Sequence, residues 1–129
     1  MKSTILKFIF ISILLAIVMP VHAASALQVW ECTLKEGKTP QDAEAVSIAW
    51  LKAAQGLKGG DQMDVYLTYP VAAEAGGGRF NFVMVVPSFA DWGEFENGYE
   101  GSAAAKADDD FADIATCSGS SLWASVKME

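Results

Sequence analysis

Residues 27–42 read LQVWECTLKEGKTPQD, and the change from strand to helix in this segment is the basis of the fold prediction. Its first part, LQVWECTL, alternates and is rich in strand formers, which predicts a strand. Thr39 can cap the helix that follows, Pro40 suits the first helical position, and Asp42 adds a negative charge to the first turn. The segment therefore predicts a strand, a short loop and the start of a helix.

Similar patterns predict the other elements. Apolar side chains recur at helical spacing from Ala43 to Leu57. Further along the chain we expect strands over residues 63–69 and 79–86 and a last strand over residues 121–128. Ser88 repeats the capping pattern before a helix beginning at Phe89, and Ser102 can cap a second helical piece to about Thr116. This order predicts one α+β domain: a ferredoxin-like βαββαβ arrangement, with a four-stranded antiparallel sheet and helices on one face.

The element order resembles the dimeric α+β barrel superfamily over nearly all of the chain after residue 23. The resemblance also rests on Gly37-Lys38-Thr39-Pro40 before the first helix and Phe89-Ala90-Asp91-Trp92 at the start of the second. It implies a homodimer in which two sheets pack face to face. The superfamily includes cofactor-free monooxygenases, haem-handling proteins and stress proteins, so the resemblance implies no single chemistry. The chain is also similar to uncharacterised exported bacterial proteins of this type.

The N-terminal segment has the order of a secretory signal peptide. Lys2 and Lys7 precede an apolar run from Phe8 to Val18, and the segment ends at Pro20-Val21-His22-Ala23, with small or modest residues at the two positions that a signal peptidase reads. The run is shorter than the roughly 20 residues of a membrane-spanning helix. We therefore expect cleavage after Ala23, a single mature domain over residues 24–129, and a periplasmic or secreted location with no membrane attachment after cleavage.

The mature domain is acidic. Without Lys2 and Lys7, 7 of the 9 basic residues remain against 16 acidic ones, which gives a net charge of about −9. Such a surface repels nucleic-acid phosphates, so no nucleic-acid partner is expected. The single histidine, His22, is lost with the signal peptide. Its loss excludes histidine-dependent nucleophiles, haem ligation by histidine and histidine-containing zinc sites, and no cofactor motif is present.

Cys32 and Cys117 are the two cysteines of the chain. In an oxidising compartment we expect them to form a disulfide. The alternative is a redox-active pair, but the chain has no Cys-x-x-Cys spacing that would lower a thiol pKa.

Strand parity separates the two faces of the predicted sheet, on the assumption that Cys32 reaches Cys117 at the end of the second helix. The side chains expected to face the helices are Trp30, Cys32, Leu34, Val65, Leu67, Phe80, Phe82, Met84, Leu122, Ala124 and Val126. Those expected on the open face are Val29, Glu31, Thr33, Tyr66, Thr68, Asn81, Val83, Val85, Trp123, Ser125 and Lys127.

The open face combines an apolar centre with four candidate ligand-binding residues: Glu31, Tyr66, Asn81 and Trp123. One interpretation is a homodimer interface in which these polar groups bond across the contact. The other is a cleft between two sheets that holds a small ligand, with Glu31 as acid or base and the other three orienting the guest. A second acidic group, Asp108 to Asp110 with Asp113, lacks the spacing of a calcium loop and is interpreted as a solvated helix face.

Two functions remain open. The favoured one is a non-enzymatic exported protein that dimerises through the open face and binds a small ligand or a protein partner. The alternative is a cofactor-free monooxygenase or isomerase of the barrel type that uses Tyr66, Asn81 and Trp123. The missing histidine weakens the enzymatic alternative without excluding it.

Overall fold

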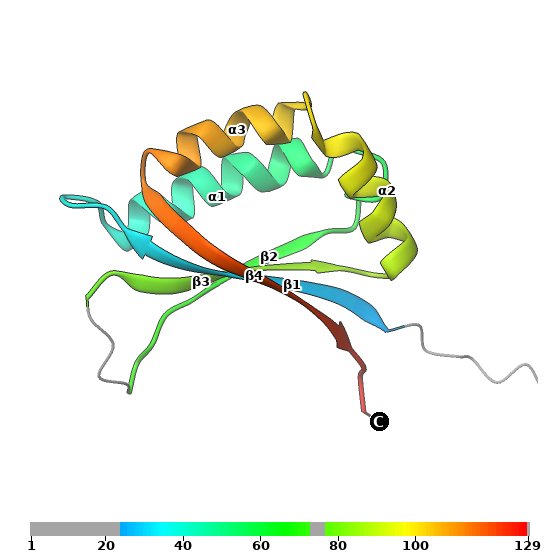
Figure 1. Ribbon diagram of the computed structural model, residues 1–129, viewed down its shortest axis with the longest axis horizontal. Helices are drawn as coiled ribbons and strands as arrows, with labels where there is room; N and C mark the ends of the chain where they lie inside the picture. The colour runs from blue at the N-terminus through cyan, green and yellow to red at the C-terminus, as the bar shows by residue number, and fades with distance from the viewer. Residues whose placement is uncertain (1–23, 73–76, 129) are drawn as a thin grey trace, which may run out of the picture.

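The computed structural model describes residues 24–72 and 77–128. The expected signal peptide, residues 1–23, lies outside this part of the chain. The elements in chain order are β1 (Ser25–Leu34), α1 (Pro40–Ala54), β2 (Asp64–Thr68), β3 (Arg79–Val86), α2 (Phe89–Tyr99), α3 (Ala103–Ala112) and β4 (Ala115–Ser125). All three helices lie on one side of the sheet (Figure 1).

The four strands form one sheet in the order β2-β3-β1-β4, and all neighbours are antiparallel. The two central strands, β1 and β3, pair from Ala26 opposite Val86 to Thr33 opposite Arg79. In chain order α1 lies between β1 and β2, and α2 and α3 lie between β3 and β4. The predicted ferredoxin-like α+β fold is therefore confirmed.

Each helix begins at the side-chain cap that the sequence predicts. The Asp42 backbone N–H donates to Thr39 Oγ1 at 3.3 Å, and the Thr39 backbone N–H donates to Asp42 Oδ2 at 2.8 Å, so the two residues form a capping box. These hydrogen bonds to Thr39 hold the pKa of the Asp42 carboxyl below its usual range. Ser88 and Ser102 cap α2 and α3 in the same way, by accepting from backbone N–H groups.

The hydrophobic core lies between the sheet and the helices. On β3, Phe80, Phe82, Met84 and Val86 are all buried against the helices. The intervening Asn81 is exposed, and the alternation places Val83 and Val85 on the opposite face with it. The parity rule thus separates the faces of β3 as expected.

Within the described ranges, no helix has the length and apolar character to cross a bilayer.

The last strand differs from the prediction. Helix α3 ends at Ala112 rather than near Thr116, and β4 begins at Ala115 and ends at Ser125, before Val126 and Lys127. Residues 115–120 carry no alternating apolar pattern that would predict a strand locally; pairing with β1 supplies their hydrogen-bond partners. The register shifts beside Gly119, whose φ of 63° suits a β-bulge.

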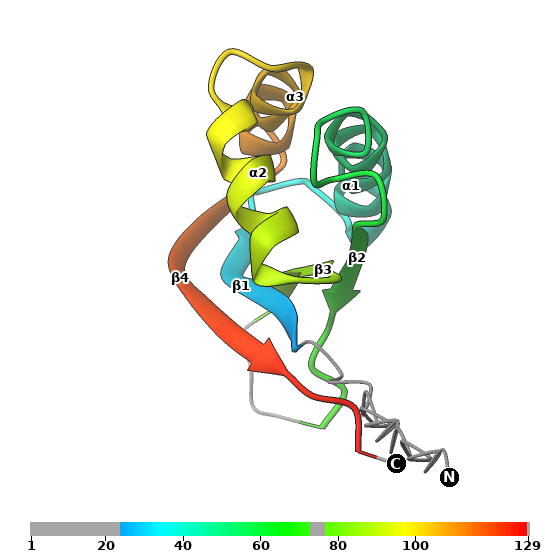
Figure 2. The ribbon, with the colours of Figure 1, turned by 90° about the vertical axis from the view of Figure 1, so that its right-hand side faces the viewer.

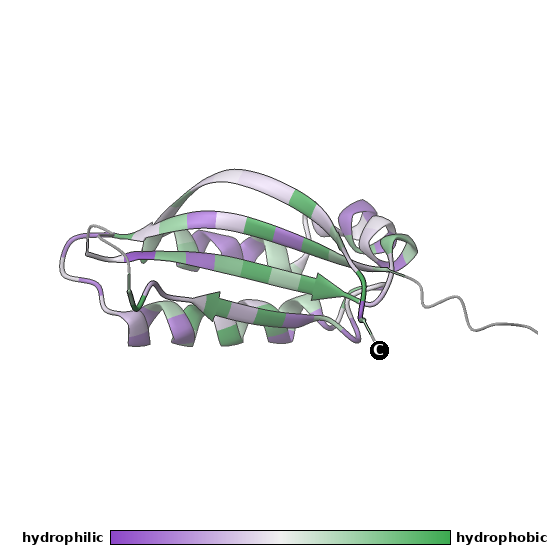
Figure 3. Ribbon diagram, turned by 90° about the horizontal axis from the view of Figure 1, so that it is seen from below, coloured by the Kyte–Doolittle hydropathy of each residue, from purple (hydrophilic) through white to green (hydrophobic). Residues whose placement is uncertain are grey.

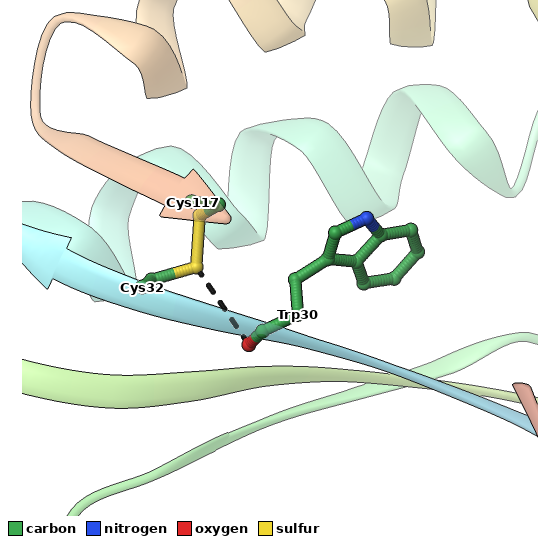
Figure 4. The surroundings of a disulfide bond; sticks show 3 residues. All are labelled: Trp30, Cys32 and Cys117. Atoms are coloured by element: carbon green, nitrogen blue, oxygen red, sulfur yellow. Dashed lines mark hydrogen bonds between the residues drawn. A yellow bond between two sulfur atoms is a disulfide. The ribbon is translucent and has the colours of Figure 1, made fainter. Parts of the chain in front are cut away.

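The expected disulfide is present. Cys32 and Cys117 are bonded across the neighbouring strands β1 and β4, with their Cα atoms 4.0 Å apart and a sequence separation of 85. Cys117 therefore lies within a strand directly opposite Cys32, and not at a helix end as assumed. Figure 4 shows the bond on the helix side of the sheet, near Trp30, whose carbonyl oxygen lies 3.8 Å from Cys32 Sγ. A bond that closes so long a loop stabilises the fold by about 4 kcal/mol in the chain-entropy model.

Candidate functional site

The structure brings three of the four predicted site residues together on the open face. Glu31 and Asn81 are direct partners on β1 and β3, and Trp123 extends from β4 opposite Leu27. These three residues line a shallow groove of about 500 Å³, which we call the open-face groove. Tyr66 is also on the open face, opposite Val83, but does not line this groove. Figure 3 shows this uncovered face with apolar and polar residues interspersed.

A larger cleft lies on the other face of the sheet, between the helices α2 and α3 and the strands β1 and β4. It encloses about 590 Å³. Figure 2 shows α2 and α3 above the β1–β4 side of the sheet, with α1 above the β2 side. This helix-side cleft is lined by Gln28, Trp30, Trp50, Phe82, Phe95, Glu96, Tyr99, Ala105, Asp108, Asp109, Phe111, Ala112, Ala115 and Cys117.

Aromatic rings form the inner wall of the helix-side cleft. The Trp50 ring from α1 meets Phe82 edge-on, with centroids 5.3 Å apart, and meets Phe95 at 6.0 Å. Trp30 from β1 contacts the opposite side of Phe82 in the same edge-on manner, at 5.7 Å. Edge-to-face packing of this kind fixes the rings relative to one another. The wall is therefore a rigid apolar surface suited to another flat ring.

A chain of two hydrogen bonds beside the aromatic wall joins α1, α2 and α3. Trp50 Nε1–H donates to the Tyr99 hydroxyl oxygen at 3.2 Å, and the Tyr99 hydroxyl donates to Asp108 Oδ2 at 2.9 Å. The pKa of Tyr99 is raised to about 12, mainly by burial; the hydrogen bond from Trp50 lowers it, and the hydrogen bond to Asp108 contributes to the rise. Tyr99 therefore stays a neutral phenol at physiological pH and acts as a hydrogen-bond donor, not as a base.

A second hydrogen-bond chain holds the other end of the cleft. Trp92 Nε1–H donates to Gln28 Oε1 at 2.9 Å, and Gln28 Nε2–H donates to Ser120 Oγ at 2.9 Å. This chain joins α2, β1 and the bulged part of β4. Because both polar atoms of the Gln28 amide are used, the side chain is fixed where it lines the cleft.

Carboxylates lie along the open edge of the cleft. Asp108 and Asp109 line it together with Ala105 and Ala112, at the i, i+3, i+4 and i+7 spacing of one helix face. Glu96 contributes a third carboxylate from α2, and desolvation raises the pKa of this carboxyl above its usual value. The neighbouring Asp110 is exposed and does not line the cleft. The acidic run is solvent-exposed as expected, but two of its members also face a cavity.

The disulfide forms part of the cleft wall. Cys32 is 3% exposed, whereas Cys117 is exposed and lines the cleft. The difference agrees with their places in the sheet, because β1 is a central strand and β4 is an outer one. The bond holds β4 against β1 at the place where the cleft is open to solvent.

The helix-side cleft was not predicted from the sequence. The acidic run was interpreted as a solvated helix face, and a site was expected on the open face. The helical spacing of Ala105, Asp108, Asp109 and Ala112 was the available signal, because two small residues beside two carboxylates on one helix face leave room above the sheet.

The fold and the cleft together define a ferredoxin-like α+β domain with an aromatic-walled cavity between its helices and its sheet. The solved structures it resembles include SnoaB, described as a cofactor-independent oxygenase from Streptomyces nogalater. The two have a TM-score of 0.59 and 11% sequence identity, over 82% of this chain and 97% of SnoaB. No family model and no curated protein matches the sequence. The comparison supports the fold.

Proposed function

We propose that the protein is a cofactor-independent oxygenase whose substrate is a flat aromatic molecule bound in the helix-side cleft. The observation that carries the proposal is the cleft itself, an aromatic wall bordered by a fixed phenol and carboxylates. The likeness to a cofactor-independent oxygenase favours this function over the non-enzymatic binding role that the sequence favoured. A binding role would need the cavity but not the polar chain beside it.

The chemistry requires a substrate that supplies its own electrons. Dioxygen reacts with organic molecules in one-electron steps, and most enzymes provide a flavin or a metal for this purpose. A CH₂ group between two aromatic rings that are conjugated to a carbonyl can instead lose a proton, and the resulting anion passes one electron to dioxygen. Recombination gives a hydroperoxide that loses water. Overall, the CH₂ group and O₂ become a carbonyl group and H₂O, which balances.

Residues of the cleft supply the proton transfers in this proposal. Glu96 is the candidate base, because a carboxyl with a raised pKa binds a proton more readily than an ordinary one. Tyr99 is the candidate donor to the developing oxyanion, because it remains protonated, and its single O–H would leave Asp108 Oδ2 to make this hydrogen bond. The Trp50 N–H fixes the orientation of the Tyr99 hydroxyl.

Oxygen uptake with anthrone tests the proposal, since anthrone is flat and carries such a CH₂ group. We expect chelator-treated wild-type protein to consume oxygen and form anthraquinone faster than buffer does. Ala105→Trp fills the cleft and should lower the rate at least about tenfold, equal to roughly 1.4 kcal/mol. Ala49→Trp places the same ring on the exposed side of α1 and should leave the rate unchanged. No uptake above buffer would contradict the oxygenase and leave a binding role.

We further propose that the protein is exported and dimerises through its open face. The Cys32–Cys117 bond supports an oxidising compartment, because such bonds are rare in the cytosol. The open face supports self-association: Val83 and Val85 lie at its centre, and Trp123 is 58% exposed at its edge. Glu31, Tyr66, Asn81 and Trp123 are then interface residues, with the open-face groove between the two sheets as a second possible ligand site.

A further inference from the structure

The residues lining the helix-side cleft carry a strong charge imbalance. Glu96, Asp108 and Asp109 contribute three carboxylates, and among the described residues around the cavity there is no lysine or arginine. The chain as a whole has 16 acidic against 9 basic residues, so the wider field has the same sign. A negatively charged ligand would meet repulsion both on approach and when bound.

The carboxylates stand beside aromatic rings. Asp108 is fixed by the Tyr99 hydroxyl at 2.9 Å, and Tyr99 lies against Phe95 with ring centroids 5.5 Å apart. Tyr99 and Trp30 are only partly buried, so both have surface available to a guest in the cleft. Aromatic faces next to carboxylates attract organic cations, through the ring quadrupole and through charge.

We propose that the helix-side cleft binds an organic cation, an aromatic ring linked by a short chain to a protonated amine. The ring lies on the aromatic wall, and the ammonium group lies at the edge formed by Asp108, Asp109 and Glu96. The inference rests on the proposed function, because it names the class of ligand for the same cleft. It also removes a difficulty of that function, because a positive charge on the substrate offsets the repulsion between its anionic intermediate and the carboxylates.

Calorimetry with three phenols of similar size and different charge tests this inference. Tyramine carries an ammonium group, 4-ethylphenol is neutral, and 3-(4-hydroxyphenyl)propionate carries a carboxylate. We expect the mature protein to bind tyramine roughly tenfold more tightly than 4-ethylphenol, and to bind the carboxylate most weakly. The preference for tyramine should shrink in about 0.5 M salt, where the Debye length is a few ångströms.

Matched variants test which carboxylates cause the preference for tyramine. Replacing both carboxylates of α3, Asp108→Asn with Asp109→Asn, should reduce the tyramine preference to within about threefold while 4-ethylphenol binds as before. Asp110→Asn removes the same charge from the next residue, which does not line the cleft, and should preserve the preference. If circular dichroism shows that the double variant is unfolded, Glu96→Gln gives the same test from α2.

Several outcomes would overturn the inference. They are equal binding of tyramine and 4-ethylphenol, tighter binding of the carboxylate, no binding of any of the three, or an equal loss of preference in Asp110→Asn. Binding is measured without oxygen, so it is separate from catalysis. Selective tyramine binding without oxidation of anthrone would refute the oxygenase and keep the cation site. Anthrone oxidation without a preference for tyramine would keep the oxygenase and refute the cation site.

Discussion

Tyr99 connects the core of the protein to its candidate site, since its hydroxyl accepts from Trp50 and donates to Asp108. Its pKa is raised to about 12, first by burial, and therefore lies above that of the unfolded chain. Its stabilising contribution is complete below pH 10 and is lost as the pH rises toward about 12, because the folded state retains a proton that the unfolded state releases.

Urea unfolding of the wild type and of Tyr99→Phe tests this contribution of Tyr99 to stability. Near pH 8 the variant should be less stable by about 1 kcal/mol, the net value of the lost hydrogen bonds. The difference should decrease between pH 10 and about 12, by about 1 kcal/mol once solvent screening of the half-exposed phenol is included. Tyr66→Phe controls for the loss of a hydroxyl at an exposed position. A difference in the free energy of unfolding that does not change with pH, or that Tyr66→Phe reproduces, would contradict this role of the Tyr99 hydroxyl.

The position of α2, which forms one wall of the helix-side cleft, depends on a glycine in the loop after α1. Gly59 has a φ of 83°, and a Cβ added there would overlap the Asp91 carbonyl oxygen and lie 2.9 Å from the Phe95 backbone N. Both groups belong to the rigid backbone of α2. The close contact between loop and helix therefore requires glycine.

We predict that Gly59→Ala lowers the free energy of unfolding by about 3 kcal/mol or more, because a left-handed alanine is strained and the helix must also move. Gly37→Ala is the matched control. Its φ is 76°, but nothing lies within 4 Å of the added Cβ, so it should cost only about 1 kcal/mol. Equal costs in urea unfolding would mean that the backbone contact does not hold α2 in place.

At the level of elements, the sequence predicted most of what local chemistry determines. Strand β3 was predicted to the residue because Pro87 ends it, and the helices began at their Thr39, Ser88 and Ser102 caps. The early part of β4 was missed because its strand character comes from pairing with β1. The helix-side cleft was missed for a related reason: Trp50, Tyr99 and Asp108 belong to three helices, and only their packing brings them together.

For the whole molecule, the open sheet face predicts a homodimer. Two such faces related by a two-fold axis would bury roughly 1,600 Å². Val83→Asp places a charge at the centre of this face, and burying it should cost several kcal/mol, so light scattering should show a monomer. Ile48→Asp is the control, because Ile48 is 69% exposed on α1, on the other side of the sheet. A monomeric wild type, or dissociation by Ile48→Asp alone, would contradict this arrangement.

Labelling with ¹⁸O₂ tests whether the helix-side cleft catalyses oxygenation without a cofactor, as proposed. Chelator-treated wild-type protein is incubated with anthrone under ¹⁸O₂, and the product is analysed by mass spectrometry. We predict that one ¹⁸O atom enters each anthraquinone, at a rate that Ala105→Trp lowers at least about tenfold and Ala49→Trp preserves. Anthraquinone that forms no faster than in buffer, or at the same rate when the cleft is filled, would contradict the claim.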